Sequence, residues 1–134
     1  MLTVLLATKN RANILRGTLQ AFCHVESPPG GWKLVIVDNG SSDGTRDVVA
    51  SFAGLLPVHY SVQPSGGKNS ALNHGLAGVE GDLVVLTDDD VFPCADWLVR
   101  LREAADTHPD HTMLGGAIVP RWAEPPHRGF GTWI

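Results

Sequence analysis

The chain has 134 residues, of which 43% are hydrophobic and 18% are charged, and its formal net charge is −4. Its mean hydropathy of +0.02 is that of an ordinary globular domain, and no apolar run approaches the roughly 20 residues that a membrane-spanning helix needs. The mild acidic excess argues against a nucleic-acid partner, because nucleic-acid binding requires a basic face.

Short apolar runs and helical periodicities alternate along the chain. Wholly apolar runs such as residues 33–37 are typical of strands buried on both faces, whereas leucines spaced as Leu15 and Leu19 indicate helices. The strands are expected at residues 2–7, 33–37, 57–62, 82–87 and 112–119. The helices between them are expected at residues 11–24, 44–54, 68–79 and 93–107, the last opened by Pro93. Residues 120–134, rich in proline, glycine and tryptophan, are expected to form an irregular tail.

This order of elements predicts a single α/β domain over residues 1–134, with a mostly parallel, Rossmann-like sheet and helices on both faces. In such sheets, ligands bind beyond the carboxyl ends of the strands. Polar residues stand at four of these ends, in segments 8–11, 38–39, 64–67 and 88–90. The sequence therefore predicts a ligand site at this edge of the sheet.

Three adjacent carboxylates, Asp88, Asp89 and Asp90, follow the fourth expected strand. Like charges this close repel one another unless a cation or solvent relieves them. Alternate side chains of an extended segment point the same way, so Asp88 and Asp90 can share one target. Mg²⁺ and Mn²⁺ prefer oxygen ligands of this kind and bridge them to substrate phosphates. We therefore predict a divalent metal site here; the alternative is a solvated acidic turn that caps the next helix.

The other strand ends carry weaker signals. Asp38 can accept a hydrogen bond from a base or a ribose, or it can form a turn with the residues that follow it. Residues 8–11 can face an anionic or nucleotide ligand, or they can be the plain entry to a helix. Gly67, Lys68 and Asn69 can approach a phosphate or form an ordinary first helical turn. The GxxxxGK[ST] pattern of a P-loop and the GxGxxG pattern of a dinucleotide-binding fold are both absent.

Two further features concern the cellular setting. Cys23 and Cys94 lie far apart and have neither CxxC nor zinc-ligand spacing, so we expect two ordinary buried thiols. The first residues show no basic segment and no cleavage site of a secretory signal, so we expect a cytoplasmic location.

Four segments taken together resemble family 2 glycosyltransferases of the GT-A fold. They are residues 4–11 (VLLATKNR), 35–45 (VIVDNGSSDGT), 66–75 (GGKNSALNHG) and 81–90 (GDLVVLTDDD). The second and fourth, in this order and at this spacing, are the most specific, and the resemblance spans nearly the whole chain.

The resemblance implies a nucleoside-diphosphate-sugar donor held at the strand ends. It places a wall around the base at residues 7–11, a partner of the base at Asp38, and a ribose contact at Asp88 or Asp89. It places the divalent metal, Mn²⁺ or Mg²⁺, on Asp90 together with Asp88. The nucleotide-binding residues expected on this basis are Ala7, Thr8, Lys9, Asn10, Arg11, Asp38, Gly67, Lys68, Asn69, Asp88 and Asp89. The implied reaction is an inverting transfer of the sugar to an unknown acceptor.

The chain departs from the family pattern in two ways that change what we expect of its nucleotide site and its activity. An aromatic side chain often stands where Lys9 is, so Lys9 would use cation–π or phosphate contacts instead. The catalytic domain of the family is considerably longer, and residues 115–120 resemble the strand just before its second half, which normally supplies the catalytic base. We therefore expect the donor-binding half of such an enzyme, with an exposed sheet edge prone to self-association.

Two alternatives remain open. The first is a nucleotide- and metal-binding fragment without transfer activity. The second is a nucleotidyltransferase. Such an enzyme would need a glycine-rich loop directly after the first strand to hold a triphosphate, but residues 8–11 contain no glycine.

Overall fold

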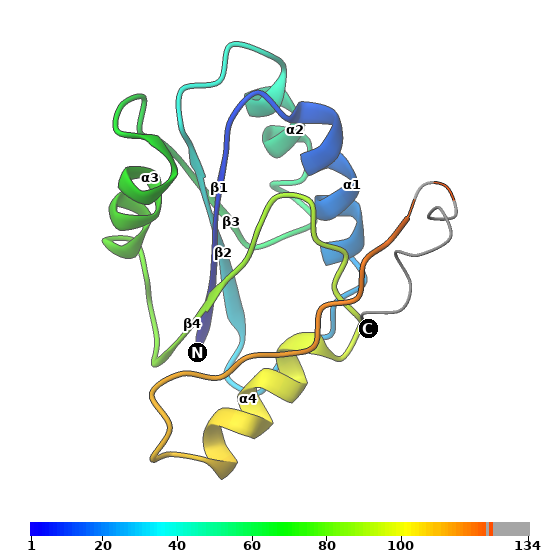
Figure 1. Ribbon diagram of the computed structural model, residues 1–134, viewed down its shortest axis with the longest axis vertical. Coiled ribbons are helices and arrows are strands. Elements are labelled where there is room, and N and C mark those ends of the chain that lie inside the picture. The colour runs from blue at the N-terminus through cyan, green and yellow to red at the C-terminus, as the bar shows by residue number, and fades with distance from the viewer. Residues whose placement is uncertain (123, 125–134) are drawn as a thin grey trace, which may run out of the picture.

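The computed structural model describes residues 1–122 and 124, in which strands and helices alternate (Figure 1). The strands are β1 (Leu2–Thr8), β2 (Trp32–Asp38), β3 (Val58–Val62) and β4 (Leu83–Leu86). The helices are α1 (Ala12–Phe22), α2 (Thr45–Ser51), α3 (Gly67–Leu76) and α4 (Trp97–Thr107). The strands pair in parallel in the order β3-β2-β1-β4. The predicted α/β fold with a parallel sheet is confirmed.

Helices cover both faces of the sheet (Figure 1). On one face, Val4 and Ile36 of the central strands pack with the apolar sides of α1 and α2, and Leu98 of α4 joins the same core. On the other face, Leu5 and Val37 pack against α3. The central strands are buried on both sides, which is the physical reason for their uninterrupted apolar runs.

The register of the sheet brings the functional segments to one edge. Thr8 at the end of β1 lies beside Asp38 at the end of β2. On the other side of β1, Leu5 pairs with Leu86, so residues 88–90 continue past the end of β4 toward the same edge. The polar residues that follow β1, β2 and β4 therefore meet, as expected for the carboxyl ends of parallel strands.

Two predicted elements differ from the structure. Residues 112–119 form no strand but run over the surface, where Ile118 is 91% exposed. Their apolar residues suit a strand, but a strand needs backbone hydrogen bonds to a neighbour, and among the described residues this segment pairs with no strand of the sheet. The helix expected from Pro93 begins at Trp97 instead, because the backbone before it is held by a hydrogen bond from the Glu26 amide to the Ala95 carbonyl (2.8 Å).

The prediction of two buried thiols is wrong, since Cys23 and Cys94 are both exposed. Cys23 directly follows the last residue of α1, and Cys94 lies in the loop before α4, so both stand where the chain leaves the packed core. Of the predicted tail, residues 120–122 and 124 are irregular, and the rest lies outside the described residues. None of the described helices combines the length and the apolar character needed to cross a membrane.

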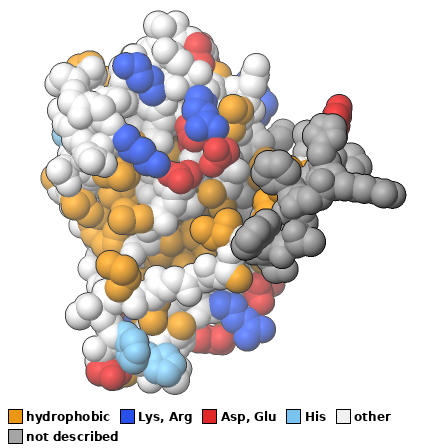
Figure 2. Space-filling view, viewed as in Figure 1, with side chains coloured by type: hydrophobic (Ala, Val, Ile, Leu, Met, Phe, Trp, Pro, Cys, Tyr) orange, Lys and Arg blue, Asp and Glu red, His pale blue; other side chains and the backbone are white. Residues whose placement is uncertain are grey.

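Strand β4 is an edge of the sheet and is only partly covered. Leu86 is 63% exposed, and Val84, two residues earlier on the same face, is also exposed. Figure 2 shows hydrophobic side chains gathered across the middle of this side of the molecule. An exposed apolar edge strand offers unpaired backbone groups and apolar surface to another chain.

We expect the 134-residue chain to self-associate through this edge, and Leu86→Lys to restore the monomer because a charged side chain there opposes strand pairing. Light scattering coupled to size-exclusion chromatography at rising concentration measures both. Leu55→Lys is the matched control, since Leu55 is equally apolar and exposed but follows α2. A wild-type chain that stays monomeric at high concentration would contradict this expectation.

Candidate functional site

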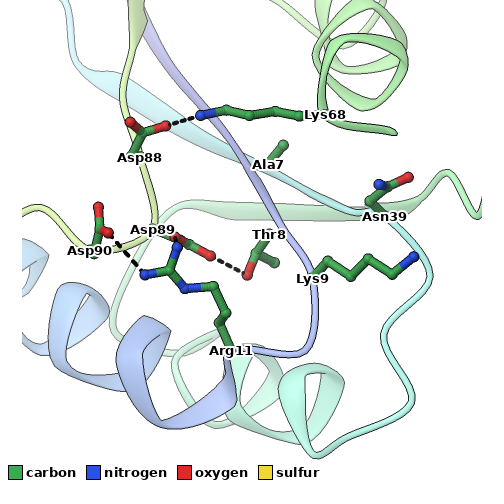
Figure 3. A pocket seen from close by; sticks show the side chains of 9 residues that line it. All are labelled: Ala7, Thr8, Lys9, Arg11, Asn39, Lys68, Asp88, Asp89 and Asp90. Atoms are coloured by element: carbon green, nitrogen blue, oxygen red, sulfur yellow. Dashed lines mark hydrogen bonds and ion pairs between the residues drawn. The ribbon is translucent and has the colours of Figure 1, made fainter. Parts of the chain in front are cut away.

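A cavity of about 230 Å³ opens at the carboxyl edge of the sheet (Figure 3). Loops after three strands and the first turn of α3 contribute to it. Its lining consists of Ala7, Thr8, Lys9, Arg11, Asn39, Lys68, Asp88, Asp89 and Asp90. Most of the residues predicted to form the site therefore meet in one place, although they are distant in sequence.

Asp89 anchors the acidic segment to the fold. Its side chain is almost completely buried, at 4% exposure, and its Oδ2 accepts a hydrogen bond from the Thr8 hydroxyl (2.7 Å). Its backbone carbonyl accepts a second hydrogen bond from the Thr18 hydroxyl of α1 (2.8 Å). Asp88 and Asp90 are exposed on either side of it, so the alternation predicted for an extended segment leaves these two carboxylates accessible.

Two cations of the chain itself face the acidic segment. The Lys68 ammonium forms an ion pair with Asp88. The Arg11 guanidinium lies 2.9 Å from Asp90 Oδ2 through Nη2 and 3.1 Å from Asp89 Oδ1 through Nη1. The hydrogen bond to Asp90 raises the pKa of Arg11, and the hydrogen bond to Asp88 raises the pKa of Lys68. Both side chains are therefore held in their charged forms, and the local excess of negative charge is small.

Asp38 is buried and does not line the cavity. Its Oδ1 accepts a hydrogen bond from the Ser41 amide (2.7 Å), and its Oδ2 accepts one from the Tyr60 hydroxyl (2.5 Å). Burial, reinforced by that hydrogen bond, raises the pKa of Tyr60, so the phenol remains a donor. Asp38 thus ties β3 and the β2–α2 loop together, and its predicted contact with a base stays a prediction.

Asn39 also lines the cavity, although it is not among the site residues predicted from the sequence. It is 8% exposed, and its Oδ1 has no hydrogen-bond partner among the described residues. A buried acceptor without a partner carries a desolvation cost that a ligand donor can offset. The only signal in the sequence was its place directly after the second strand, where an Asn-Gly pair reads as a turn.

Three other predicted residues do not line the cavity. Asn10, the one described non-glycine residue with a positive φ (52°), accepts a hydrogen bond from the Ser42 amide at its Oδ1 (2.7 Å). It therefore joins the loops that follow β1 and β2. Gly67 begins α3 and Asn69 is exposed beside Lys68, so of this trio only Lys68 reaches the cavity.

The donor set suits a hard divalent cation. Asp88 and Asp90 present exposed carboxylate oxygens on the open side of the cavity, the ligand type that Mg²⁺ and Mn²⁺ prefer. A second group of potential metal ligands, His108, Asp110 and His111, lies on the exposed surface after α4, and none of the three lines this cavity.

The chain belongs to glycosyl transferase family 2, whose family model matches residues 3–128. It is 30% identical over 103 residues to the beta-monoglucosyldiacylglycerol synthase of Trichormus variabilis, an alignment that covers 74% of this chain and 22% of that protein. This establishes the family that the four motifs indicated.

Solved structures agree on the fold. The structure resembles S. aureus TarS with a TM-score of 0.75 and 23% identity, over 90% of this chain and 23% of TarS. It also resembles the mannosyltransferase PcManGT from Pyrobaculum calidifontis in complex with GDP-Man and Mn²⁺, with a TM-score of 0.71 and 29% identity, over 78% of this chain and 32% of that one. The predicted GT-A fold is confirmed, and the chain spans only between 22% and 32% of the length of these relatives.

Proposed function

We propose that this chain is the donor-binding part of a metal-dependent glycosyltransferase that takes a nucleoside-diphosphate sugar. The observation that supports this most directly is the cavity itself, in which two exposed carboxylates, two cations and an unpartnered amide oxygen converge. Carboxylates alone would suit a metal, and cations alone would suit a phosphate. The two together suit a diphosphate that arrives with a divalent cation.

Asp90 and Asp88 would hold the divalent cation, Mn²⁺ or Mg²⁺. When bound, such a cation neutralises charge on the departing nucleoside diphosphate. The complex of PcManGT with GDP-Man and Mn²⁺ supports this assignment by similarity. Lys68 and Arg11 lie beside the same carboxylates and would donate to phosphate oxygens.

The opposite end of the cavity would receive the nucleoside. Asn39 Oδ1 is the acceptor left free there, and Lys9 extends toward the same end (Figure 3). We infer that Asn39 meets an N–H of the base, whereas Asp38, whose two oxygens are already bonded, holds the loop that presents Asn39. Ala7 and Thr8 would form the floor between the two ends.

For the whole protein we propose displacement at the anomeric carbon with inversion. The acceptor hydroxyl forms the new C–O bond as the bond to the diphosphate breaks, and a general base takes its proton. We assign this base to none of the acids that line the cavity, because they contact Thr8, Arg11 and Lys68. The acceptor remains unassigned.

Thermal unfolding with a panel of nucleotides tests the proposal. We expect UDP or GDP to stabilise the chain only when Mn²⁺ is present, by about 2.7 kcal/mol at a ligand concentration 100 times the dissociation constant. The monophosphates are the matched control, since they lack the second phosphate. If no diphosphate stabilises the chain with Mn²⁺, the proposed function is wrong.

The same panel separates the alternatives. Donor hydrolysis should therefore be measured beside nucleotide affinity on the same chain. Binding without hydrolysis identifies a nucleotide-binding part that needs the rest of the protein for chemistry. Preference for a triphosphate over the diphosphate would instead indicate a nucleotidyltransferase.

A further inference from the structure

Each exposed carboxylate of the cavity is already paired with a cation of the chain. Lys68 pairs with Asp88, and Arg11 pairs with Asp90 while keeping a second contact to the buried Asp89 (Figure 3). Arg11 directly precedes α1 and Lys68 lies in the first turn of α3, so only the fold brings them to the acids. The two carboxylates best placed for a divalent cation are therefore not free.

A divalent cation that enters alone must compete with these pairs. It needs the same carboxylate oxygens, and it is repelled by an ammonium and a guanidinium a few ångströms away. The three carboxylates and two cations together carry one negative charge. A divalent cation alone would reverse this to one positive charge, leave Lys68 without its partner Asp88 and leave Arg11 with Asp89 alone.

A diphosphate removes this penalty. Its oxygens accept charge-assisted hydrogen bonds from both the guanidinium and the ammonium, so the displaced cations gain new partners. Its negative charge also restores the local balance. The unpartnered Oδ1 of buried Asn39 indicates, independently of the acids, that the cavity accommodates a ligand with an N–H donor, which a metal alone lacks.

We propose that Arg11 and Lys68 are specificity-determining residues that make the cavity select a divalent cation together with a diphosphate over the cation alone. This inference rests on the proposed function. In the chain without a ligand, Lys68 forms an ion pair with Asp88, and Arg11 forms one with Asp90. In the complex they turn to the phosphate oxygens, and the contact with Asp89 keeps Arg11 in place. By linkage, the diphosphate raises the affinity for metal by the same factor as the metal raises that for the diphosphate.

Calorimetric titration of Mn²⁺, with and without UDP and GDP, tests this proposal in wild type, Arg11→Gln and Lys68→Gln. We expect wild type to bind Mn²⁺ alone weakly and at least about tenfold more tightly with the diphosphate, within the usual range of coupling between sites. Each variant should bind Mn²⁺ alone about two- to fivefold more tightly, because an ion pair that competes with the metal is gone. Each should also lose most of the enhancement by diphosphate.

Arg100→Gln is the matched control, since Arg100 is an exposed residue of α4 that pairs with Asp96, the residue before that helix, and neither residue lines the cavity. If Arg11→Gln unfolds, Lys68→Gln still tests the proposal. The Lys68–Asp88 pair is exposed, so we expect its loss to leave the fold intact. Unchanged or weaker binding of Mn²⁺ alone in the variants, with the wild-type enhancement intact, would overturn this inference and leave the proposed function standing. Absence of diphosphate binding to wild type with Mn²⁺ would instead overturn the proposed function.

Discussion

Asp90→Asn should abolish the dependence of UDP or GDP binding on Mn²⁺ while leaving the fold intact. The substitution keeps the shape of the side chain but removes the charge that a hard cation requires. Asp90 is exposed, and Arg11 is its one cationic partner among the described residues, so little folding free energy depends on it. Loss of an outer-shell partner alone costs 10- to 100-fold in metal affinity, so we expect about 100-fold for a direct ligand.

Calorimetry at fixed Mn²⁺ measures this loss, and circular dichroism checks that the variant is folded. The matched control is Glu103→Gln, which makes the same change in charge at an exposed position on α4. If Asp90→Asn still binds UDP or GDP in an Mn²⁺-dependent way with the wild-type affinity, Asp90 is not a metal ligand.

Asp89→Ala should lower the free energy of unfolding by about 2–3 kcal/mol, whereas Asp88→Ala should change it by no more than about 0.5 kcal/mol. The two substitutions are chemically identical and one residue apart. Only Asp89 is buried, and its loss leaves the buried Thr8 hydroxyl without an acceptor and takes one partner from Arg11. Asp88 is exposed and paired with an exposed lysine, an arrangement that contributes little to stability.

Urea unfolding of both variants beside wild type measures the difference, provided that the dependence on urea keeps its slope. Equal destabilisation by the two substitutions would show that Asp89 is not the anchor of the acidic segment. Destabilisation confined to Asp88→Ala would reverse the assignment of the two residues.

The strands, the helices and the location of the site follow from local patterns. β1 and β2 are apolar runs because both of their faces are buried, and the spacing of Leu15 and Leu19 predicts the one helix between them, α1. Parallel strands place their carboxyl ends at one edge, so the acids after β4 and the polar residues after β1 could be expected to meet.

The individual roles could not be read in the same way. The sequence alone does not distinguish Asp88, Asp89 and Asp90, because all three are aspartates. Asp89 differs through its hydrogen bond from the Thr8 hydroxyl, which is 81 residues away in the sequence. Likewise, the Tyr60 hydroxyl occupies one oxygen of Asp38, while the adjacent Asn39 keeps an unpartnered oxygen in the cavity. Hydrogen bonds between residues so far apart in the sequence produce no periodic pattern from which they could be predicted.

The sequence by itself thus determined most of the strands and helices, the family that the chain resembles and the edge of the sheet at which the candidate site lies. The tertiary structure alone decided which carboxylates are exposed, which cations pair with them, and that residues 112–119 are not a strand. The reason is physical. Periodicity records how a segment faces the core, whereas pairing of strands and of charges depends on groups that the fold brings from elsewhere in the chain.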